Sequence, residues 1–193
     1  MTKKFKYSYP KLDHLFLGMD LAYTTARTGL CGLGLKEDRI LLVSAPIIDP
    51  LSGFRGDLEN GVVGWVNGLM KKYRCNRATL ALGRDARARV LLIHTLKSDL
   101  GFQFYENGDA PPARRLIEFD PKVQISDWLG EGALAAYDEA SFLGRRKLVE
   151  KTIARFNSFF GEFPISQAEF STDRHFDSYV RAIAAFENQK DRT

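Results

Sequence analysis

Two carboxylates near opposite ends of the chain stand where metal chemistry could take place. Asp20 follows residues 15–19, a run of apolar residues and glycine that is typical of a buried strand. Asp177 lies in the segment 173–180, which is predicted to open a helix. A carboxylate at the tip of an apolar strand is costly to bury unless a cation or hydrogen bonds compensate it. The alternative role for Asp20 is to cap the turn at residues 22–25. If the fold brings the two acids together, they could bind a hard divalent metal ion.

The predicted helix at residues 173–189 carries three groups that could contribute to such a site. Asp173 and Asp177 are four residues apart and therefore share a helix face. Asp173 is better explained as a capping or first-turn acid that stabilises the helix dipole. Asp177 lies deeper in the helix, where capping explains it less well, so a functional role is favoured. His175 could orient a carboxylate or move a proton, or it could be an ordinary surface residue.

Two acids in the middle of the chain are further candidates. Glu118 lies in the predicted strand 115–119 between two apolar residues, so its side chain would point to the other sheet face or to the strand tip. Its alternative role is an edge-strand ion pair with Arg114 or Arg115. Asp85 could complete the set of metal ligands, but it also suits the first turn of a helix, and that alternative is slightly favoured.

The composition describes an ordinary globular protein. The chain has 193 residues, of which 45% are hydrophobic and 27% charged, enough for one domain with a real core. We expect a basic tail at residues 1–13 and a single domain at residues 14–193. The net charge of +4 permits a polyanionic partner. Cys31 and Cys75 show no metal-binding spacing and are expected to be buried free thiols in a reducing compartment. No segment is apolar enough to span a membrane, and none resembles a secretory signal, so a cytoplasmic location is expected.

The apolar patterns predict an α/β fold with the element order β-β-β-α-β-α-β-α-α. Strands are predicted at residues 14–22, 28–36, 39–45, 78–82 and 115–119. Helices are predicted at residues 62–73, 84–97, 141–160 and 173–189, with a helical turn or short helix at 121–129. Residues 46–59, 101–113 and 130–140 are predicted to be loops or irregular. Three strands with short connections form an antiparallel meander, and the later strand–helix units complete a mixed sheet with helices on its faces.

These elements resemble the ribonuclease-H-like fold and, more narrowly, an uncharacterised family of predicted RuvC-like nucleases (domain-of-unknown-function family 429). Four segments resemble the family's motifs in the family's order: LGMD at 17–20 its opening G-x-D strand, LIEFDP at 116–121 its E-x-Y-P strand end, Tyr137 with GRRKLV at 144–149 its Y-K…G-R-x-x-R-x-x-L segment, and HFDSY at 175–179 its H-x-x-D-A helix start. The family usually has I-D-x-P at the end of its fourth strand. Here that place reads ALGRD at 81–85, so the acid is absent or displaced to Asp85.

The resemblance implies a metal-dependent nuclease. Asp20, Glu118 and Asp177, with Asp85 as a further candidate, would bind one or two Mg²⁺ or Mn²⁺ ions, and His175 would assist. A metal-bound water would attack a nucleic-acid phosphodiester. The alternative is a non-catalytic member of the same fold that serves as a binding or assembly module with a degenerate metal site, which the missing fourth-strand acid favours.

Basic side chains near the acids could hold a phosphate backbone in a sequence-independent way. The candidates are Arg84, Arg87, Arg145 and Arg146. The last two lie in the first turn of a predicted helix, where the helix dipole disfavours cations. Solvated helix faces are the alternative explanation for each cluster. The expected partner is nucleic acid rather than a membrane, and because RuvC-like resolvases act as dimers, a homodimer is a further expectation.

Overall fold

The computed structural model describes residues 9–21, 28–48, 57–83, 90–105, 111–138, 142–156 and 173–190. The strands are β1 (His14–Asp20), β2 (Thr28–Lys36), β3 (Arg39–Ser44), β4 (Ile47–Ile48), β5 (Ala78–Leu82), β6 (Gln103–Phe104) and β7 (Arg114–Glu118). The helices are α1 (Asp57–Lys72), α2 (Val90–Ser98), α3 (Pro121–Leu129), α4 (Gly132–Asp138), α5 (Phe142–Phe156) and α6 (Asp173–Lys190). None of these helices is both long enough and apolar enough to cross a membrane.

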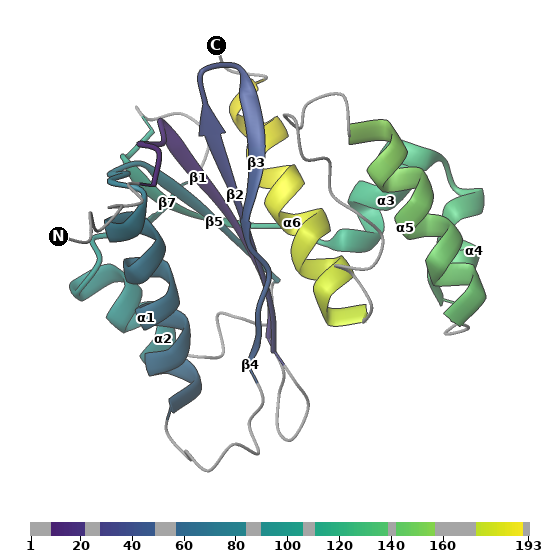
Figure 1. Ribbon diagram of the computed structural model, residues 1–193. Coiled ribbons are helices and arrows are strands. Elements are labelled where there is room, and N and C mark those ends of the chain that lie inside the picture. The colour runs from purple at the N-terminus through teal and green to yellow at the C-terminus, as the bar shows by residue number, and fades with distance from the viewer. Residues whose placement is uncertain are drawn as a thin grey trace, which may run out of the picture.

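The described strands form one mixed sheet in the order β3-β2-β1-β5-β7-β6, with β4 paired to β2 (Figure 1). Strands β1, β2 and β3 are antiparallel, whereas β5 is parallel to β1 and β7 is parallel to β5. This is the predicted meander followed by strand–helix units, so the predicted fold class is confirmed. Because β1, β5 and β7 are parallel, their carboxyl ends meet at one edge of the sheet, which is called the carboxyl edge below.

Several element boundaries differ from the prediction. Helix α4 occupies residues that were predicted to be irregular. Gly130, with a φ of 85°, ends α3. The segment after this glycine is rich in alanine and leucine, which favour a helix. Helix α1 begins at Asp57, before the apolar stripe from which its start was predicted. Strands β4 and β6 have two residues each, too few to show a periodicity. Of the second predicted helix, only α2 lies within the described residues.

Helices cover both faces of the sheet. In Figure 1, α1 and α2 lie on one face and α6 lies on the other, with α3, α4 and α5 on the far side of α6. Strand β1 is buried along its whole length, because alternate residues serve two cores. Leu15, Leu17 and Met19 belong to the core under α1 and α2, whereas Phe16 belongs to the core under α6. Leu12, within the predicted tail, is also buried in the core under α1 and α2.

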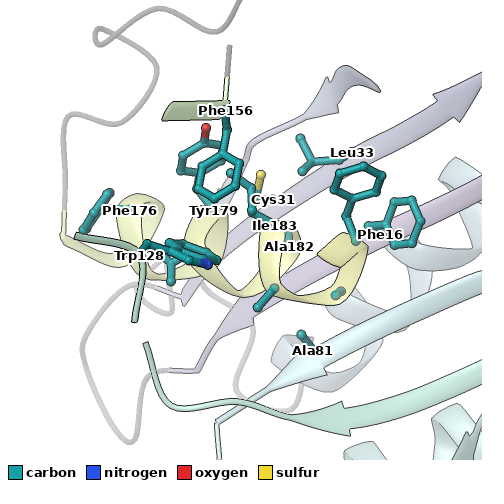
Figure 2. Close-up of a cluster of buried hydrophobic side chains, with 14 of the residues drawn as sticks. Phe16, Cys31, Leu33, Ala81, Trp128, Phe156, Phe176, Tyr179, Ala182 and Ile183 are labelled. Carbon is teal, nitrogen blue, oxygen red and sulfur yellow. The ribbon is translucent and has the colours of Figure 1, made fainter. Parts of the chain in front are cut away.

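The contact between β1 and α6 requires a glycine. A Cβ atom at Gly18 would collide with the carbonyl oxygen of Ser178, so only glycine allows the helix to approach the strand this closely. Further along, the rings of Phe16 and Phe186 meet edge to face with centroids 5.4 Å apart. Helix α6 therefore runs antiparallel to β1, and its first turns lie beside the carboxyl end of the strand. Figure 2 shows the side chains of this core, including Phe16, Tyr179 and Ala182.

A buried polar contact crosses the sheet at the opposite end of the strands. His14 Nε2 lies 2.9 Å from the hydroxyl of Thr79, and Arg115 Nε donates to the same hydroxyl at 2.7 Å. All three side chains are buried. Burial, together with the charges of Arg115 and Arg77, lowers the pKa of His14 from 6.5 to about 3. His14 is therefore a neutral core residue. The two cysteines, Cys31 and Cys75, are buried free thiols, as the sequence predicts.

Candidate functional site

Asp20 ends β1 at the carboxyl edge and faces α6. It lies two residues after Gly18, so strand alternation places both on the α6 side of the sheet. Its Oδ1 accepts a hydrogen bond from Arg181 Nη1 on α6 at 2.7 Å, a distance typical of a charge-assisted bond. The side chains of Arg181 and Asp20 are only 9% and 10% exposed. The strand-end carboxylate is thus compensated, as its burial requires, but by an arginine that sequence reasoning did not identify.

Asp177 lies close to this ion pair. It precedes Arg181 by four residues on α6, so the two side chains share a helix face. Tyr137, on α4, donates its hydroxyl hydrogen to Asp177 Oδ1 at 2.8 Å. The pKa of Tyr137 is raised chiefly by burial, and further by the charge of Asp177 and the hydrogen bond to that carboxylate. The charge of Asp20 also raises this pKa, whereas the charge of Arg181 lowers it. Asp20 and Asp177 therefore both act on Tyr137, which is held neutral as a hydrogen-bond donor.

Gly83, directly after β5, leaves room for the guanidinium. In the parallel register Gly18 pairs with Ala81, so Gly83 lies beside Asp20 at the carboxyl edge. A Cβ atom on Gly83 would lie 3.0 Å from Arg181 Nη2, tighter than ordinary contact. Gly83 lies within residues 81–85, the stretch in which the resemblance would place the fourth-strand acid. In this chain the position has no side chain, and the guanidinium of Arg181 lies against it.

Glu118 ends β7 at the same edge, next to Leu82 in the parallel register. Ile117 belongs to the core under α6, and Leu116 to the core under α1 and α2. Strand alternation therefore assigns Glu118 to the α1 and α2 side, opposite Asp20. This is one of the two orientations that the sequence predicts for it. It is not the orientation that would bring it to Asp20.

The described side chains do not fit a two-metal site. In the part of the chain with described side chains, no group of three or more His, Cys, Asp or Glu residues could hold a metal ion. Asp20 has one oxygen bonded to a guanidinium, and Glu118 lies on the other face. The pairing of Asp20 with a buried arginine suits an ion pair better than the dense set of oxygen ligands that a divalent ion requires.

The other predicted site residues lie outside what the structure describes. Arg84, Asp85 and Arg87 fall between β5 and α2, in residues that are not described. The backbone places His175 in the first turn of α6, and Arg145 and Arg146 near the start of α5, but their side chains are not described. Their predicted roles stay predictions.

Arg181 has a sequence signal that could have identified it. Every residue from 178 to 186 is buried, and Arg181 is the one charged residue in that run. A charge on the apolar face of a helix needs a partner, because an unpaired charge is rarely buried. A buried strand-end carboxylate is the kind of partner that it needs, so pairing the two unexplained charges would have predicted the contact.

Neither a family model nor a curated protein sequence matches the chain. Among solved structures it is similar to Thermus thermophilus RuvC, both alone and in complex with a Holliday junction substrate. The TM-scores are 0.52 and 0.53 at 10% identity, and each alignment covers 93% of this chain and 97% or 98% of RuvC. A human cytomegalovirus terminase nuclease domain is less similar, with a TM-score of 0.47, 10% identity, and coverage of 95% and 86%. The chain therefore has a RuvC-like ribonuclease-H fold. The narrower resemblance to family 429 stays a prediction.

Proposed function

We propose that this protein binds nucleic acid at the carboxyl edge of its sheet and, in the state described, does not cleave it. The observation that carries the proposal is the ion pair between Asp20 and Arg181, which stands where a ribonuclease-H-like nuclease would place a carboxylate for metal. This is the non-catalytic reading of the fold, with a degenerate metal site.

Exposed positive charge on the helices beside α6 supports a nucleic-acid partner. On α5, Lys147, Lys151 and Arg155 are exposed and spaced four residues apart, so they form one line, here called the α5 basic stripe. Glu150 adjoins the stripe. On α3, the ammonium group of the exposed Lys122 lies 5.7 Å from the ring centroid of Tyr137, whose hydroxyl contacts Asp177. Such cations bind the phosphate backbone without regard to sequence. The likeness to a RuvC structure in complex with a Holliday junction supports the same partner.

A second candidate function is metal-dependent hydrolysis of nucleic-acid phosphodiesters. The effect of both Asp20 and Asp177 on Tyr137 favours it, because these are two of the acids at which the resemblance implies metal binding. A bound divalent ion would supply an activated water and stabilise developing charge. For this function Arg181 would have to release Asp20, and side chains outside the described set, such as His175 or Asp85, would have to complete the ligands. A homodimer, also implied by the resemblance, would be tested by sedimentation.

One experiment separates the two functions. Fluorescence anisotropy measures binding to labelled single-stranded DNA, duplex DNA, RNA–DNA hybrid and a four-way junction at 50 and 200 mM salt. A protein that makes six phosphate contacts should lose affinity ~10³-fold or more between these two salt concentrations. The same samples are then incubated with Mg²⁺ or Mn²⁺ and separated on denaturing gels. Asp20→Asn and Asp177→Asn are measured in parallel with the unsubstituted protein.

The proposed function predicts salt-dependent binding and intact substrates with either metal. Cleavage by the unsubstituted protein that both variants lose would establish the second candidate instead. An affinity no better than about 10⁻⁴ M on every substrate, the weak end of non-specific binding, would remove nucleic-acid binding altogether.

A further inference from the structure

We propose that the sheet edge opposite the carboxyl edge binds single-stranded nucleic acid through an exposed tyrosine and four cations. At this amino edge, where β1, β5 and β7 begin, five exposed side chains form what is here called the amino-edge cluster: Tyr9, Lys11, Lys72, Arg74 and Arg77. Strands rise about 3.3 Å per residue, so the length of β1 separates the cluster from Asp20 by roughly 20 Å. The amino-edge cluster is therefore a second surface, and its binding goes beyond the proposed function.

Two segments of the chain supply the cluster, and backbone hydrogen bonds hold them side by side. Leu12 N donates to Tyr73 O at 3.1 Å, and Leu15 N donates to Arg77 O at 3.0 Å. Residues 9–13 therefore run beside the turn that joins α1 to β5. The fold thus brings these exposed side chains onto one surface at the start of two parallel strands.

The cluster gathers positive charge. The pKa of the Cys75 thiol is raised chiefly by burial and also by the charge of Asp13, whereas the charges of Arg77 and Lys11 lower it, so these charged groups all lie near that thiol. Asp13 is bonded to the β2–β3 turn, where its Oδ2 accepts a hydrogen bond from the backbone N–H of Glu37 at 2.8 Å. In the part of the chain that the structure describes, no carboxylate forms an ion pair with a cation of the cluster. Exposed positive charge of this kind attracts a polyanion.

Arg74 occupies a backbone position that favours glycine. Its φ is 49°, in the left-handed region, two residues after the end of α1. Arg74 N donates to Lys71 O at 3.2 Å. Cys75 N donates to Met70 O at 2.9 Å, and together these are the two bonds of a Schellman motif. A side chain in this conformation costs free energy that glycine avoids. An arginine here goes against the local preference, as expected where a side chain has a function.

Tyr9 gives the cluster a ring on which a base can stack. Tyr9 is 50% exposed, and among the described side chains it is the one exposed aromatic residue. The Tyr73 ring lies against it with centroids 5.6 Å apart and an interplanar angle of 65°, and Lys72 Nζ lies 4.1 Å from the Tyr9 centroid. These contacts fix the ring, and Arg74 Nη2 holds the backbone below it by a bond of 3.1 Å to the carbonyl oxygen of Tyr9.

The combination of a ring with cations selects the partner. Cations alone would bind duplex and single strand alike, because both present phosphates. An exposed ring adds affinity only for an unpaired base, since single-strand-binding proteins combine a basic surface with aromatic side chains on which bases stack. The helix dipole explains Lys72, which lies in the last turn of α1, but it does not explain Lys11 or Arg77, which lie outside that helix.

Fluorescence anisotropy tests the inference on the full chain, with a labelled single strand of about 12 nucleotides and a duplex of the same length. Anionic lipid vesicles and a polyglutamate peptide are the competing polyanions. The variants are Arg74→Gly, Lys11→Gln combined with Arg77→Gln, Tyr9→Ala and Tyr9→Phe. Lys97→Gln, which removes an exposed charge from α2, is the control for net charge. Lys147→Glu combined with Lys151→Glu reports separately on the α5 basic stripe.

Arg74→Gly and the combined Lys11 and Arg77 variant should weaken single-strand binding about fivefold for each cation removed at about 0.1 M salt, well beyond the effect of Lys97→Gln. Arg74→Gly should do so without lowering the melting temperature, because it relieves the left-handed backbone. Tyr9→Ala should weaken single-strand binding at least about fivefold and leave duplex binding unchanged, whereas Tyr9→Phe should retain both.

Amino-edge variants that bind the single strand as tightly as Lys97→Gln does would overturn the inference. So would equal losses on single strand and duplex in Tyr9→Ala, or an unsubstituted protein that binds vesicles or polyglutamate but no single strand. A loss confined to the α5 stripe variant would remove this inference and keep the proposed function. A loss confined to the amino-edge variants would keep this inference and remove the contribution of the α5 stripe.

Discussion

Asp20 and Arg181, 161 positions apart in the sequence, are joined by a buried ion pair of 2.7 Å at the carboxyl edge of the sheet. The pair links the end of β1 to the middle of α6. It gives each charge the partner that its burial requires, and it places a cation next to Gly83 at the end of β5. The burial of Asp20 at the end of β1 is therefore explained by Arg181, a partner near the other end of the sequence.

Breaking this pair from either side should destabilise the fold strongly. Asp20→Asn or Arg181→Met should each lower the free energy of unfolding by about 3–5 kcal/mol, because each leaves one buried charge without its partner. The loss in the combined variant should be smaller than the sum of the two single losses, and the difference should be roughly 0.5–3 kcal/mol. Urea unfolding of the three variants forms a double-mutant cycle. Additive effects would show that the two side chains do not interact in solution.

Gly18→Ala should destabilise the protein through the contact between β1 and α6. The added methyl group would collide with the backbone of Ser178, which cannot move without shifting the helix, so a loss of about 3 kcal/mol or more is expected. Gly64→Ala on α1 is the matched control, because nothing lies within 4 Å of its added Cβ atom. That substitution should stabilise the helix by up to about 1 kcal/mol. Equal effects at the two positions in urea unfolding would contradict the close approach.

Tyr137 should make stability depend on pH in the alkaline range. Its pKa is raised in the folded protein above the 10.0 of a free tyrosine, chiefly by burial, so the native state keeps the proton that the unfolded chain loses. The stabilisation is fully present below pH 10 and is lost as the pH rises beyond it. The free energy of unfolding should therefore fall less between pH 9 and pH 11 in Tyr137→Phe than in the unsubstituted protein. Identical slopes would mean that Tyr137 is free to ionise.

His14 should make stability depend on pH in the acid range. Its pKa is lowered to about 3 in the folded protein, so below pH 6.5 the unfolded chain binds a proton that the native state refuses. The stabilisation is present above pH 6.5 and is lost as the pH falls toward 3, by about 2–3 kcal/mol between pH 7 and pH 4.5. His14→Gln should remove this part of the acid sensitivity, whereas the same change at the exposed His94 should leave it in place. Unfolding in urea at the two pH values measures the difference.

The α5 basic stripe should contribute to nucleic-acid affinity. Lys147→Glu and Lys151→Glu should weaken binding to every substrate to a similar degree and should reduce the dependence of affinity on salt, because phosphate contacts carry no sequence information. Lys97→Glu on α2, an exposed lysine on the other side of the sheet, changes the net charge equally. Equal losses for Lys97→Glu and the stripe variants would assign the effect to net charge alone.

The strands and the fold class could be predicted because they depend on apolar runs. The predicted strand at 28–36 coincides with β2 and that at 78–82 with β5, and both are buried almost throughout. Such segments carry their signal in their own residues. Helix α4 does not, since Gly130 and Gly132 at its start hide a short run of helix-forming residues, and it supplies Tyr137 to the site. The sequence left open whether Asp20 and Asp177 come together; the structure places the first turns of α6, which carry Asp177, beside the carboxyl end of β1.

The chemistry of the site was less predictable, because it depends on which side chains meet across elements. The small and apolar residues around Arg181 indicate that it is buried in α6, but the identity of the group opposite it follows only from the approach of that helix to β1. In the same way, the face on which Glu118 lies follows from the register between β5 and β7. A sequence pattern of carboxylates is compatible with a metal cluster and with an ion pair, and the packing decides between them.

Because α6 covers the face of the sheet that holds Phe16, this layer of the core cannot form during translation until α6 has been synthesised. Strand β1 leaves the ribosome far ahead of α6, so its apolar face lies open while most of the chain is still being made. Domains with contacts this distant in sequence fold slowly and expose aggregation-prone apolar surface before they fold. Nascent chains that stall before α6 should therefore engage holding chaperones, and the pairing of Asp20 with Arg181 would be among the last events of biogenesis.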